Sequence, residues 1–284
     1  MTTSLHQIAT TEHIDADGIS FAYRRLGGGE GLPVVLLQHF RGNLDNWDPQ
    51  LIDALADDRE VILVDYAGAG ASTGTPARSI NAIGRQIISF ITALGLEQVD
   101  LLGFSMGGFV AQEIVLLRPP LVRRLVLIGT GPKGGPNMHG YADDVDAHAR
   151  PDAASAADLL YMFFAHTDTS QNAGREYLQR ITSRTEDRDT PTTLALRDAE
   201  FEAITEWGIP DHTALARLAA IRQATLILQG DNDIMVPTKS SYIMAGLIPN
   251  ATLKIFPDAG HGSLFQYPID TAAEVNAFLG YGSR

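Results

Sequence analysis

The sequence predicts an α/β fold, in which a mostly parallel β-sheet is covered by helices on both faces. Apolar runs of strand length alternate along the chain with longer segments of helical periodicity. The runs are continuously apolar instead of alternating with polar residues, which is typical of strands that are buried on both faces. The repeated strand–helix–strand order indicates parallel neighbours that are joined by right-handed crossovers.

The first expected elements are two short strands that a turn connects. They cover residues 12–14 and 20–25, and Ala16-Asp17-Gly18 has the composition of a turn. Further strands are expected at residues 34–38, 61–64, 99–104, 125–128, 225–228 and 252–255. Helical patterns lie at residues 48–55, 80–94, 106–117, 239–247 and 271–279. The chain is therefore expected to return repeatedly to one sheet.

The alternation of strands and helices is interrupted between residues 132 and 222. A cluster of glycine and proline at residues 131–136 opens this stretch. The rest shows apolar groups without strand alternation, and it is too long to be a plain loop. Within it, residues 182–190 are strongly charged and predict a solvated turn. We expect a helical cap or lid over the carboxyl edge of the sheet, inserted into a core formed by residues 1–131 and 223–284.

Composition limits the classes of partner. The 284 residues are enough for one α/β domain with an insertion. The formal net charge of −13 argues against binding to the phosphate backbone of nucleic acids. The chain has no cysteine, which excludes disulfides, thiolate catalysis and Cys-ligated metals.

Targeting signals are also absent from the pattern of the chain. Residues 1–18 lack a basic segment followed by an apolar core, and no apolar stretch approaches membrane-spanning length. We therefore expect a cytoplasmic protein with no membrane partner. The oligomeric state is left open, a homodimer included.

The most informative segment is Gly103-Phe104-Ser105-Met106-Gly107. It joins the apolar run at residues 99–104 to the helical pattern at 106–117. A turn this tight forces Ser105 towards strained backbone angles, and the flanking glycines allow the strand and the helix to approach closely. The serine hydroxyl is then held at the carboxyl end of the strand, where it can attack a carbonyl carbon.

A base and an acid follow the serine at later strand ends. Serine is a poor nucleophile unless a base lies within hydrogen-bond reach and an acceptor orients that base. His261 follows the last predicted strand, and Asp231 and Asp233 follow the strand before it. Asp231 competes as the acid, but it directly follows its strand and could simply cap the next turn. Asp258 is only three positions from His261 and is badly placed to orient that ring.

The chain resembles the α/β-hydrolase superfamily over nearly its full length. The resemblance rests on the serine turn at residues 103–107, the Gly-Asp-Asn-Asp segment with Pro237, the Gly-His-Gly segment at 260–262 and the loop Gln38-His39-Phe40-Arg41-Gly42. It implies an eight-stranded sheet with a lid. The family pattern places the acid four residues before the proline, which favours Asp233 over Asp231.

This resemblance implies a role for each catalytic residue. Ser105 Oγ would attack the carbonyl, and His261 would remove its proton and later deliver it to the leaving group. Asp233 would hold the imidazole in the correct tautomer. The backbone N–H groups of Met106 and Phe40 are the expected donors of the oxyanion hole.

The loop at residues 38–42 departs from the His-Gly that is common in the family. We expect the Phe40 ring to narrow the pocket, and we favour a structural role for Arg41 over a contact to an anionic group. The substrate-binding candidates are His39, Arg41, Met162, Phe163, Phe164 and Trp207. An apolar cluster in a helix is more often part of the core, so the last four are the weaker candidates.

The nucleophile discriminates between reactions. Haloalkane dehalogenases and epoxide hydrolases of this fold need an aspartate where Ser105 stands. A serine predicts acyl transfer to water through an acyl-enzyme, with a carboxylic ester of a small or medium apolar substrate as the main hypothesis. No cofactor is required, and the remaining histidines show no metal-ligand spacing.

Three alternatives stay open. The first is a C–C bond hydrolase of the meta-cleavage type that acts on β-diketone-like products, with Arg41 or a lid arginine such as Arg175 binding an acid group. The second is a cofactor-free perhydrolase. The third, of a different class, is a small-molecule receptor that retains the triad but turns over slowly.

Overall fold

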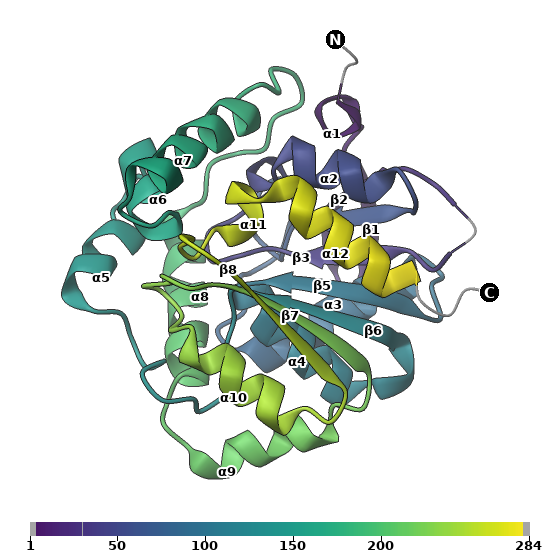
Figure 1. Cartoon of the computed structure of the whole chain (residues 1–284). Coiled ribbons are helices and arrows are strands. Elements are labelled where there is room, and N and C mark those ends of the chain that lie inside the picture. Colours follow the sequence, from purple (N-terminus) through teal and green to yellow (C-terminus); the bar gives the residue numbers. More distant parts are fainter. Residues whose placement is uncertain (1–3, 30, 281–284) are drawn as a thin grey trace.

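The computed structural model describes residues 4–29 and 31–280, and these form an eight-stranded sheet flanked by helices (Figure 1). The strand order is β1-β2-β4-β3-β5-β6-β7-β8. Only β1 with β2 and β2 with β4 pair antiparallel, and every other pair is parallel. The bounds are β1 Glu12–Ala16, β2 Ile19–Leu26, β3 Val34–Leu37, β4 Val61–Val64, β5 Val99–Phe104, β6 Val122–Ile128, β7 Ala224–Gly230 and β8 Ala251–Phe256. The predicted fold class is confirmed.

Helices cover both faces of the sheet. In Figure 1, α2 (Pro49–Ala56) and α12 (Pro268–Gly280) lie on one face and contact each other. The other face carries α3 (Ile80–Ala93), α4 (Met106–Leu117) and α10 (Lys239–Leu247). The short helices α1 (Leu5–Ile8) and α11 (Ser263–Gln266) complete the set outside the insertion. None of the helices in the described ranges is long and apolar enough to cross a membrane.

The stretch between β6 and β7 is helical, as expected. It holds α5 (Asp143–Ala149), α6 (Ala156–Phe163), α7 (Asp168–Ile181), α8 (Leu194–Trp207) and α9 (His212–Leu215), followed by a 3-10 turn at Ala216–Ala220. Figure 1 shows α5, α6 and α7 at one edge of the sheet. We call residues 132–222 the cap segment. Its exact boundaries as a separate unit stay a prediction.

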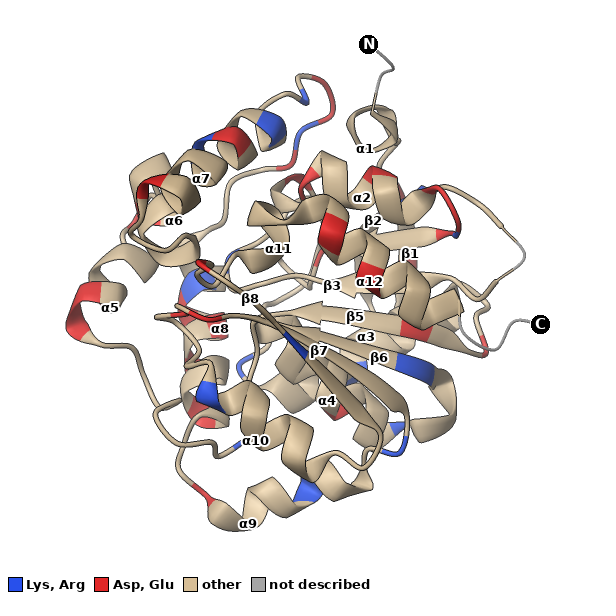
Figure 2. Cartoon of the chain, in the orientation of Figure 1, with Lys and Arg blue, Asp and Glu red and all other residues tan. Residues whose placement is uncertain are grey.

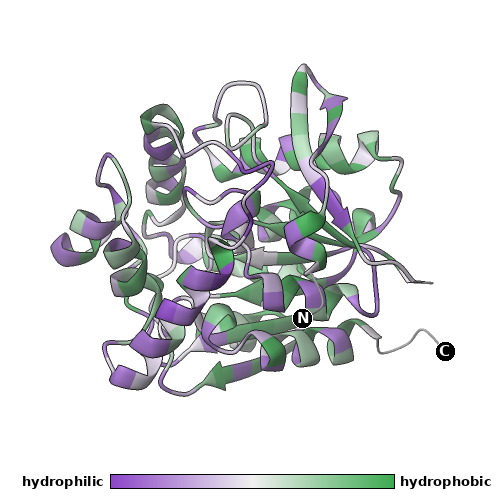
Figure 3. Ribbon diagram, turned by 90° about the horizontal axis from the view of Figure 1, so that it is seen from above, coloured by the Kyte–Doolittle hydropathy of each residue, from purple (hydrophilic) through white to green (hydrophobic). Residues whose placement is uncertain are grey.

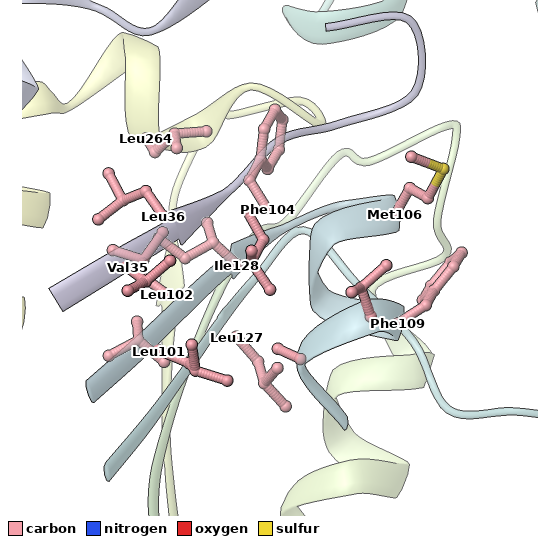
Figure 4. Close-up of a cluster of buried hydrophobic side chains, with 14 of the residues drawn as sticks. Val35, Leu36, Leu101, Leu102, Phe104, Met106, Phe109, Leu127, Ile128 and Leu264 are labelled. Atoms are coloured by element: carbon pink, nitrogen blue, oxygen red, sulfur yellow. The ribbon is translucent and has the colours of Figure 1, made fainter. Parts of the chain in front are cut away.

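The core lies between the central strands and the helices on either side. All residues of β3, β4 and β5 are buried, which explains why β3 and β4 are continuously apolar and β5 is apolar except for Asp100. Figure 4 shows side chains of β3, β5 and β6 packed together, with Phe109 of α4 and Leu264 of α11 beside them. Seen from above, the strands are mostly hydrophobic and the helices mix both kinds of residue (Figure 3). Charged residues lie mainly on the helices and loops (Figure 2).

Two expectations about charged residues are corrected. β6 begins at Val122 instead of residue 125, because Arg123 forms an ion pair with the buried Asp100 of β5 at 2.5 Å and the strand can therefore include it. Residues 182–190 are not a simple solvated turn. Arg184 is buried there and donates hydrogen bonds to the carbonyls of His6, Gln7 and Ala9, so this stretch ties the cap segment to the N-terminal region.

Candidate active site

The turn at Ser105 is strained in the way that its sequence predicts. Ser105 has φ 56° and ψ −120°, a region that costs a non-glycine residue about 1–3 kcal/mol. Three hydrogen bonds hold it there. Its N–H donates to the carbonyl of Ile128 at 2.9 Å, and its own carbonyl accepts from Gly108 N–H at 2.9 Å and from Thr130 Oγ1 at 2.8 Å. These hydrogen bonds therefore keep Ser105 in its strained conformation.

Two glycines make the turn possible because backbone atoms lie where a Cβ would be. A Cβ on Gly103 would come within 2.3 Å of the carbonyl oxygen of Gly107, and one on Gly107 within 2.0 Å of the carbonyl oxygen of Leu37. Both distances are far below van der Waals contact, and neither obstacle is a flexible side-chain end. The start of α4 thus packs directly on the end of β3.

We expect Gly107→Ala to lower the free energy of unfolding by about 1–3 kcal/mol or more, because the backbone of β3 must move to admit the methyl group. Gly246→Ala is the matched control. Gly246 is exposed in α10 with open space around its Cβ position, so that change should stabilise by about 0.5–1 kcal/mol. Urea denaturation of both variants measures the difference, and equal midpoints for Gly107→Ala and the unchanged protein would contradict it.

Ser105, His261 and Asp233 come together at the carboxyl ends of three strands. His261 Nε2 lies 2.8 Å from Ser105 Oγ, and His261 Nδ1 lies 2.8 Å from Asp233 Oδ2. An ionised carboxylate can only accept, so Nδ1 carries the proton and Nε2 is free to accept the serine proton. All three side chains are buried, which strengthens these interactions.

The Asp233 carboxylate is held by two backbone N–H groups that follow it in the chain and by the side chain of Gln229. Its Oδ1 accepts from the N–H groups of Met235 at 2.8 Å and Val236 at 2.9 Å, and its Oδ2 accepts from Gln229 Nε2 at 2.8 Å. These three donors fix the orientation of the carboxylate and aim Oδ2 at the histidine.

The two competing carboxylates make other contacts. Asp231 is exposed and accepts from Ala259 N–H at 3.1 Å and from Asn232 Nδ2 at 2.6 Å. Asp258 accepts from Thr167 Oγ1 at 2.8 Å. Neither has a hydrogen bond to His261 in the part of the chain that the structure describes. The position of Asp233 after the strand, and not closeness in sequence, therefore brings a carboxylate to the ring.

The two expected oxyanion donors lie beside the serine. Met106 is the first residue of α4, so its N–H has no intrahelical acceptor, and no side chain caps this end of the helix. The helix dipole adds a partial positive charge at the same point. Phe40 lines the same cavity as Ser105, from the loop after β3. Their assignment as an oxyanion hole stays a prediction.

His39 is neutral and held in one tautomer. It is buried, and burial lowers its pKa to about 4. Its Nδ1 donates to the carbonyl of Phe40 at 2.8 Å, because a carbonyl only accepts. The ring packs edge-on against Phe104 and Phe163, with centroid distances of 5.4 Å and 5.1 Å. His39 is therefore a fixed part of the cavity wall.

A cavity of about 540 Å³ opens above the serine. Its base holds Ser105 and His261, and the cap segment closes it with apolar side chains such as Leu159, Met162 and Phe163. Four of the six predicted substrate contacts line it, namely His39, Arg41, Met162 and Phe163. Whether they bind substrate stays a prediction. The volume suits a small or medium-sized molecule.

The predictions for Phe164 and Trp207 are corrected. Phe164 follows α6 with an extended backbone and packs against Tyr177, at a centroid distance of 5.9 Å, away from the cavity lining. Trp207 stacks on Phe109 at 5.3 Å, and its Nε1 donates to Gly131 at 3.4 Å. Both are buried core residues. Phe164 points to another side of the chain than its neighbour Phe163, which lines the cavity, and Trp207 packs on α4 through Phe109. Arg175 is exposed and also lies outside the lining.

Sequence reasoning missed several cavity residues. Asn43, Asn46, Arg188, Pro191, Thr192 and Met235 also line the cavity. Asn46 ends a short 3-10 helix (Leu44–Asn46) and the others lie outside helices and strands, so no periodicity marked any of them. The charge of the stretch at residues 182–190 was the one available signal for Arg188.

Comparison with known proteins finds hydrolases that are similar to this chain over most of its length. A family model described as "alpha/beta hydrolase fold" matches residues 33–268. The chain is 25% identical over 281 residues to "Putative carbamate hydrolase RutD" of Pseudomonas savastanoi pv. phaseolicola, covering 96% of this chain and 98% of the relative. It is 29% identical over 257 residues to "2-hydroxymuconate semialdehyde hydrolase" of Pseudomonas putida, covering 88% of each. A solved structure, "Alpha/beta hydrolase fold protein from Chitinophaga pinensis", superposes with a TM-score of 0.92 at 35% identity, covering 97% of this chain and 99% of the other.

Proposed function

The chain belongs to the α/β-hydrolase fold family, and we propose that it is a serine hydrolase that cleaves a carboxylic ester or a related acyl bond of a small to medium apolar substrate. One observation carries the proposal: Ser105 Oγ lies 2.8 Å from His261 Nε2, whose Nδ1 is bonded to Asp233, at the base of a cavity. The backbone strain at Ser105 destabilises the fold, and a purely structural role for the serine and its oriented base would not explain why it is present.

The reaction follows from the contacts of the three residues. Ser105 Oγ attacks the substrate carbonyl carbon as its proton passes to His261 Nε2, and Asp233 stabilises the resulting imidazolium. The N–H groups of Met106 and Phe40 donate hydrogen bonds to the carbonyl oxygen and stabilise the negative charge that develops on it. His261 then protonates the leaving alcohol, which departs and leaves an acyl-serine. Water, deprotonated by His261, releases the acid and regenerates Ser105.

The lining of the cavity supports the substrate class. Apart from the base, the walls include Phe40, Leu159, Met162, Phe163 and Met235, so an apolar acyl or alcohol group is stabilised by burial there. The cap segment supplies part of this wall. The size of the substrate therefore depends on how the cap packs, and a volume of about 540 Å³ admits groups of several carbons.

A C–C bond hydrolase is the second candidate, favoured by one observation. Arg188 lines the cavity and is 43% exposed. Its Nε lies 3.6 Å from Asp45 Oδ2 and its Nη1 donates to the carbonyl of Arg184 at 3.1 Å, so it is Nη2 of this guanidinium that is left for an acid group on the substrate. Arg41 is a poorer candidate because its guanidinium donates to three backbone carbonyls, and Arg175 lies outside the cavity. The relative from Pseudomonas putida that is named a 2-hydroxymuconate semialdehyde hydrolase supports this candidate too.

A turnover screen distinguishes the candidates. It should compare p-nitrophenyl esters of increasing acyl length with a thioester, a lactone, a carbamate and a 2-hydroxy-6-oxo-dienoate. We expect the short and medium esters to be hydrolysed fastest. Preference for the dienoate by a large factor in kcat/KM would replace the ester proposal with C–C cleavage. Ligand-dependent thermal stabilisation without turnover of any substrate would favour a receptor and contradict an enzyme.

A further inference from the structure

The cap segment forms several hydrogen bonds with Arg41, the residue that follows the expected oxyanion donor Phe40. The Arg41 N–H donates to Glu200 Oε2 of α8 at 2.7 Å, and the Arg41 carbonyl accepts from Thr192 Oγ1 at 2.6 Å. Its guanidinium donates to the carbonyls of Ala149 at 3.2 Å and Pro151 at 2.8 Å. The backbone N–H, the carbonyl and the side chain of Arg41 are therefore all hydrogen-bonded to the cap segment.

This residue sits in a turn that a free chain would not favour. Gly42 N–H donates to the carbonyl of His39 at 3.0 Å, which closes a four-residue turn with Phe40 and Arg41 at its centre. Arg41 has φ 63°, the positive value that the third residue of a type II turn requires and that glycine normally supplies. The turn thus needs outside contacts to keep its central peptide in this orientation.

Both polar groups of that central peptide are hydrogen-bonded, one within the turn and one from the cap. The carbonyl of Phe40 accepts from His39 Nδ1 at 2.8 Å, and the N–H of Arg41 donates to Glu200 at 2.7 Å. Rotation of the peptide would break both bonds at once. Phe40 supplies the carbonyl of this peptide, so the two bonds restrict the ψ angle of Phe40, whose own N–H lies on the preceding peptide.

Glu200, which accepts the hydrogen bond from the Arg41 N–H, is an acid buried in the protein interior. Its side chain is 1% exposed, and its Oε1 has no hydrogen-bond partner among the described residues. Burial is the main cause that raises its pKa to about 8, so it is mostly a neutral carboxyl at pH 7. A buried acid with one unpaired oxygen is costly, and its single hydrogen bond goes to the loop beside the serine.

We infer that Glu200 is a positioning residue, which acts from the cap segment through Arg41 to hold the Phe40 N–H in place for the developing oxyanion. The inference rests on the proposed serine-hydrolase function. It makes the cap more than a wall of the cavity, because the geometry of the oxyanion loop then depends on the cap being seated. Thr192 contributes to the same contact through the Arg41 carbonyl.

Two variants of Glu200 separate positioning from mere burial. Glu200→Gln keeps an oxygen that accepts from Arg41, whereas Glu200→Met keeps the volume without an acceptor. With p-nitrophenyl acetate as the probe, we expect Glu200→Met to lower kcat about 10- to 100-fold while KM changes by less than about threefold. Glu200→Gln should restore kcat to within about threefold of the unchanged protein. Glu202→Met is the control, since Glu202 is on the same helix, exposed and paired with Arg78.

Amide hydrogen exchange of the peptide that contains Arg41 gives a readout independent of turnover. We expect faster exchange of the loop in Glu200→Met and unchanged exchange in Glu200→Gln and Glu202→Met. Thr192→Val is a second variant, for use if Glu200→Met fails to fold, because it changes no fully buried group. It removes the hydrogen bond to the Arg41 carbonyl and should also speed exchange of the loop.

The two readouts separate the possible failures. If the loop exchanges equally in all folded variants, or if Glu200→Met keeps its kcat, the positioning role is wrong. A lower kcat shared equally by Glu200→Gln and Glu200→Met would also contradict it, because the hydrogen bond would then not be the cause. If the unchanged protein hydrolyses nothing but the exchange pattern is as expected, the contact holds and the serine-hydrolase proposal fails.

Discussion

Ser105→Ala is expected to lower turnover by a factor on the order of 10⁶ and to abolish labelling by a fluorophosphonate probe. The reason is that no other hydroxyl lies within hydrogen-bond distance of His261 Nε2 in the described part of the chain. Without Oγ no acyl-enzyme forms, and the cavity retains only its capacity to bind. The fold should persist, because the hydroxyl of Ser105 contributes no other hydrogen bond to the turn.

The labelling experiment needs a matched serine. Ser240→Ala makes the same chemical change at a buried serine in α10, whose Oγ donates to Met138 Sδ at 3.5 Å, and labelling should be unaffected. Circular dichroism and thermal unfolding check that both variants are folded. Equal labelling of Ser105→Ala and the unchanged protein would refute Ser105 as the nucleophile.

Asp233→Asn is expected to lower kcat by a factor on the order of 10⁴, far more than Asp231→Asn. In this variant the side-chain amide oxygen can still accept from the N–H groups of Met235 and Val236, so the NH₂ group would face His261. An amide donor there favours the tautomer with the proton on Nε2, which can no longer accept from Ser105. Asp231 is exposed and has no contact with the ring, so its substitution leaves the base unchanged.

Steady-state kinetics of the two aspartate variants on one p-nitrophenyl ester measure this difference. The comparison should be made at a pH where the unchanged protein is fully active, with thermal unfolding as the control for stability. A larger loss of kcat in Asp231→Asn than in Asp233→Asn would move the acid to the earlier position and contradict the geometry described above.

The strands and the serine turn could be predicted because their signals are local. The run that ends at Phe104 is apolar except for Asp100, since both faces of β5 are covered, and its end coincides with the observed end of the strand. The glycines at 103 and 107 stand where a methyl group would meet backbone atoms. Such steric requirements act over a few residues, so they leave a direct trace in the chain.

The cavity could not be predicted in the same way. Phe163 and Phe164 are adjacent and chemically identical, yet only the first lines the cavity. Arg188 and Glu200 carry no motif, and their roles depend on a loop and a helix of the cap that return to the core. The buried Arg184 shows the same problem, because a charged stretch looks solvated until its partners are known.

The sequence by itself predicted the fold class, the order of the proposed nucleophile, acid and base along the chain, and the place of the strained serine, because backbone sterics and hydrophobic periodicity depend on neighbouring residues. Only the tertiary structure decided which cap side chains line the cavity, how Arg41 is held and how close His261 comes to Ser105. These depend on contacts between segments more than a hundred residues apart, such as the 2.8 Å bond from Ser105 to His261 and the 2.7 Å bond from Arg41 to Glu200. Their partners are selected by packing, which no single stretch of the chain specifies.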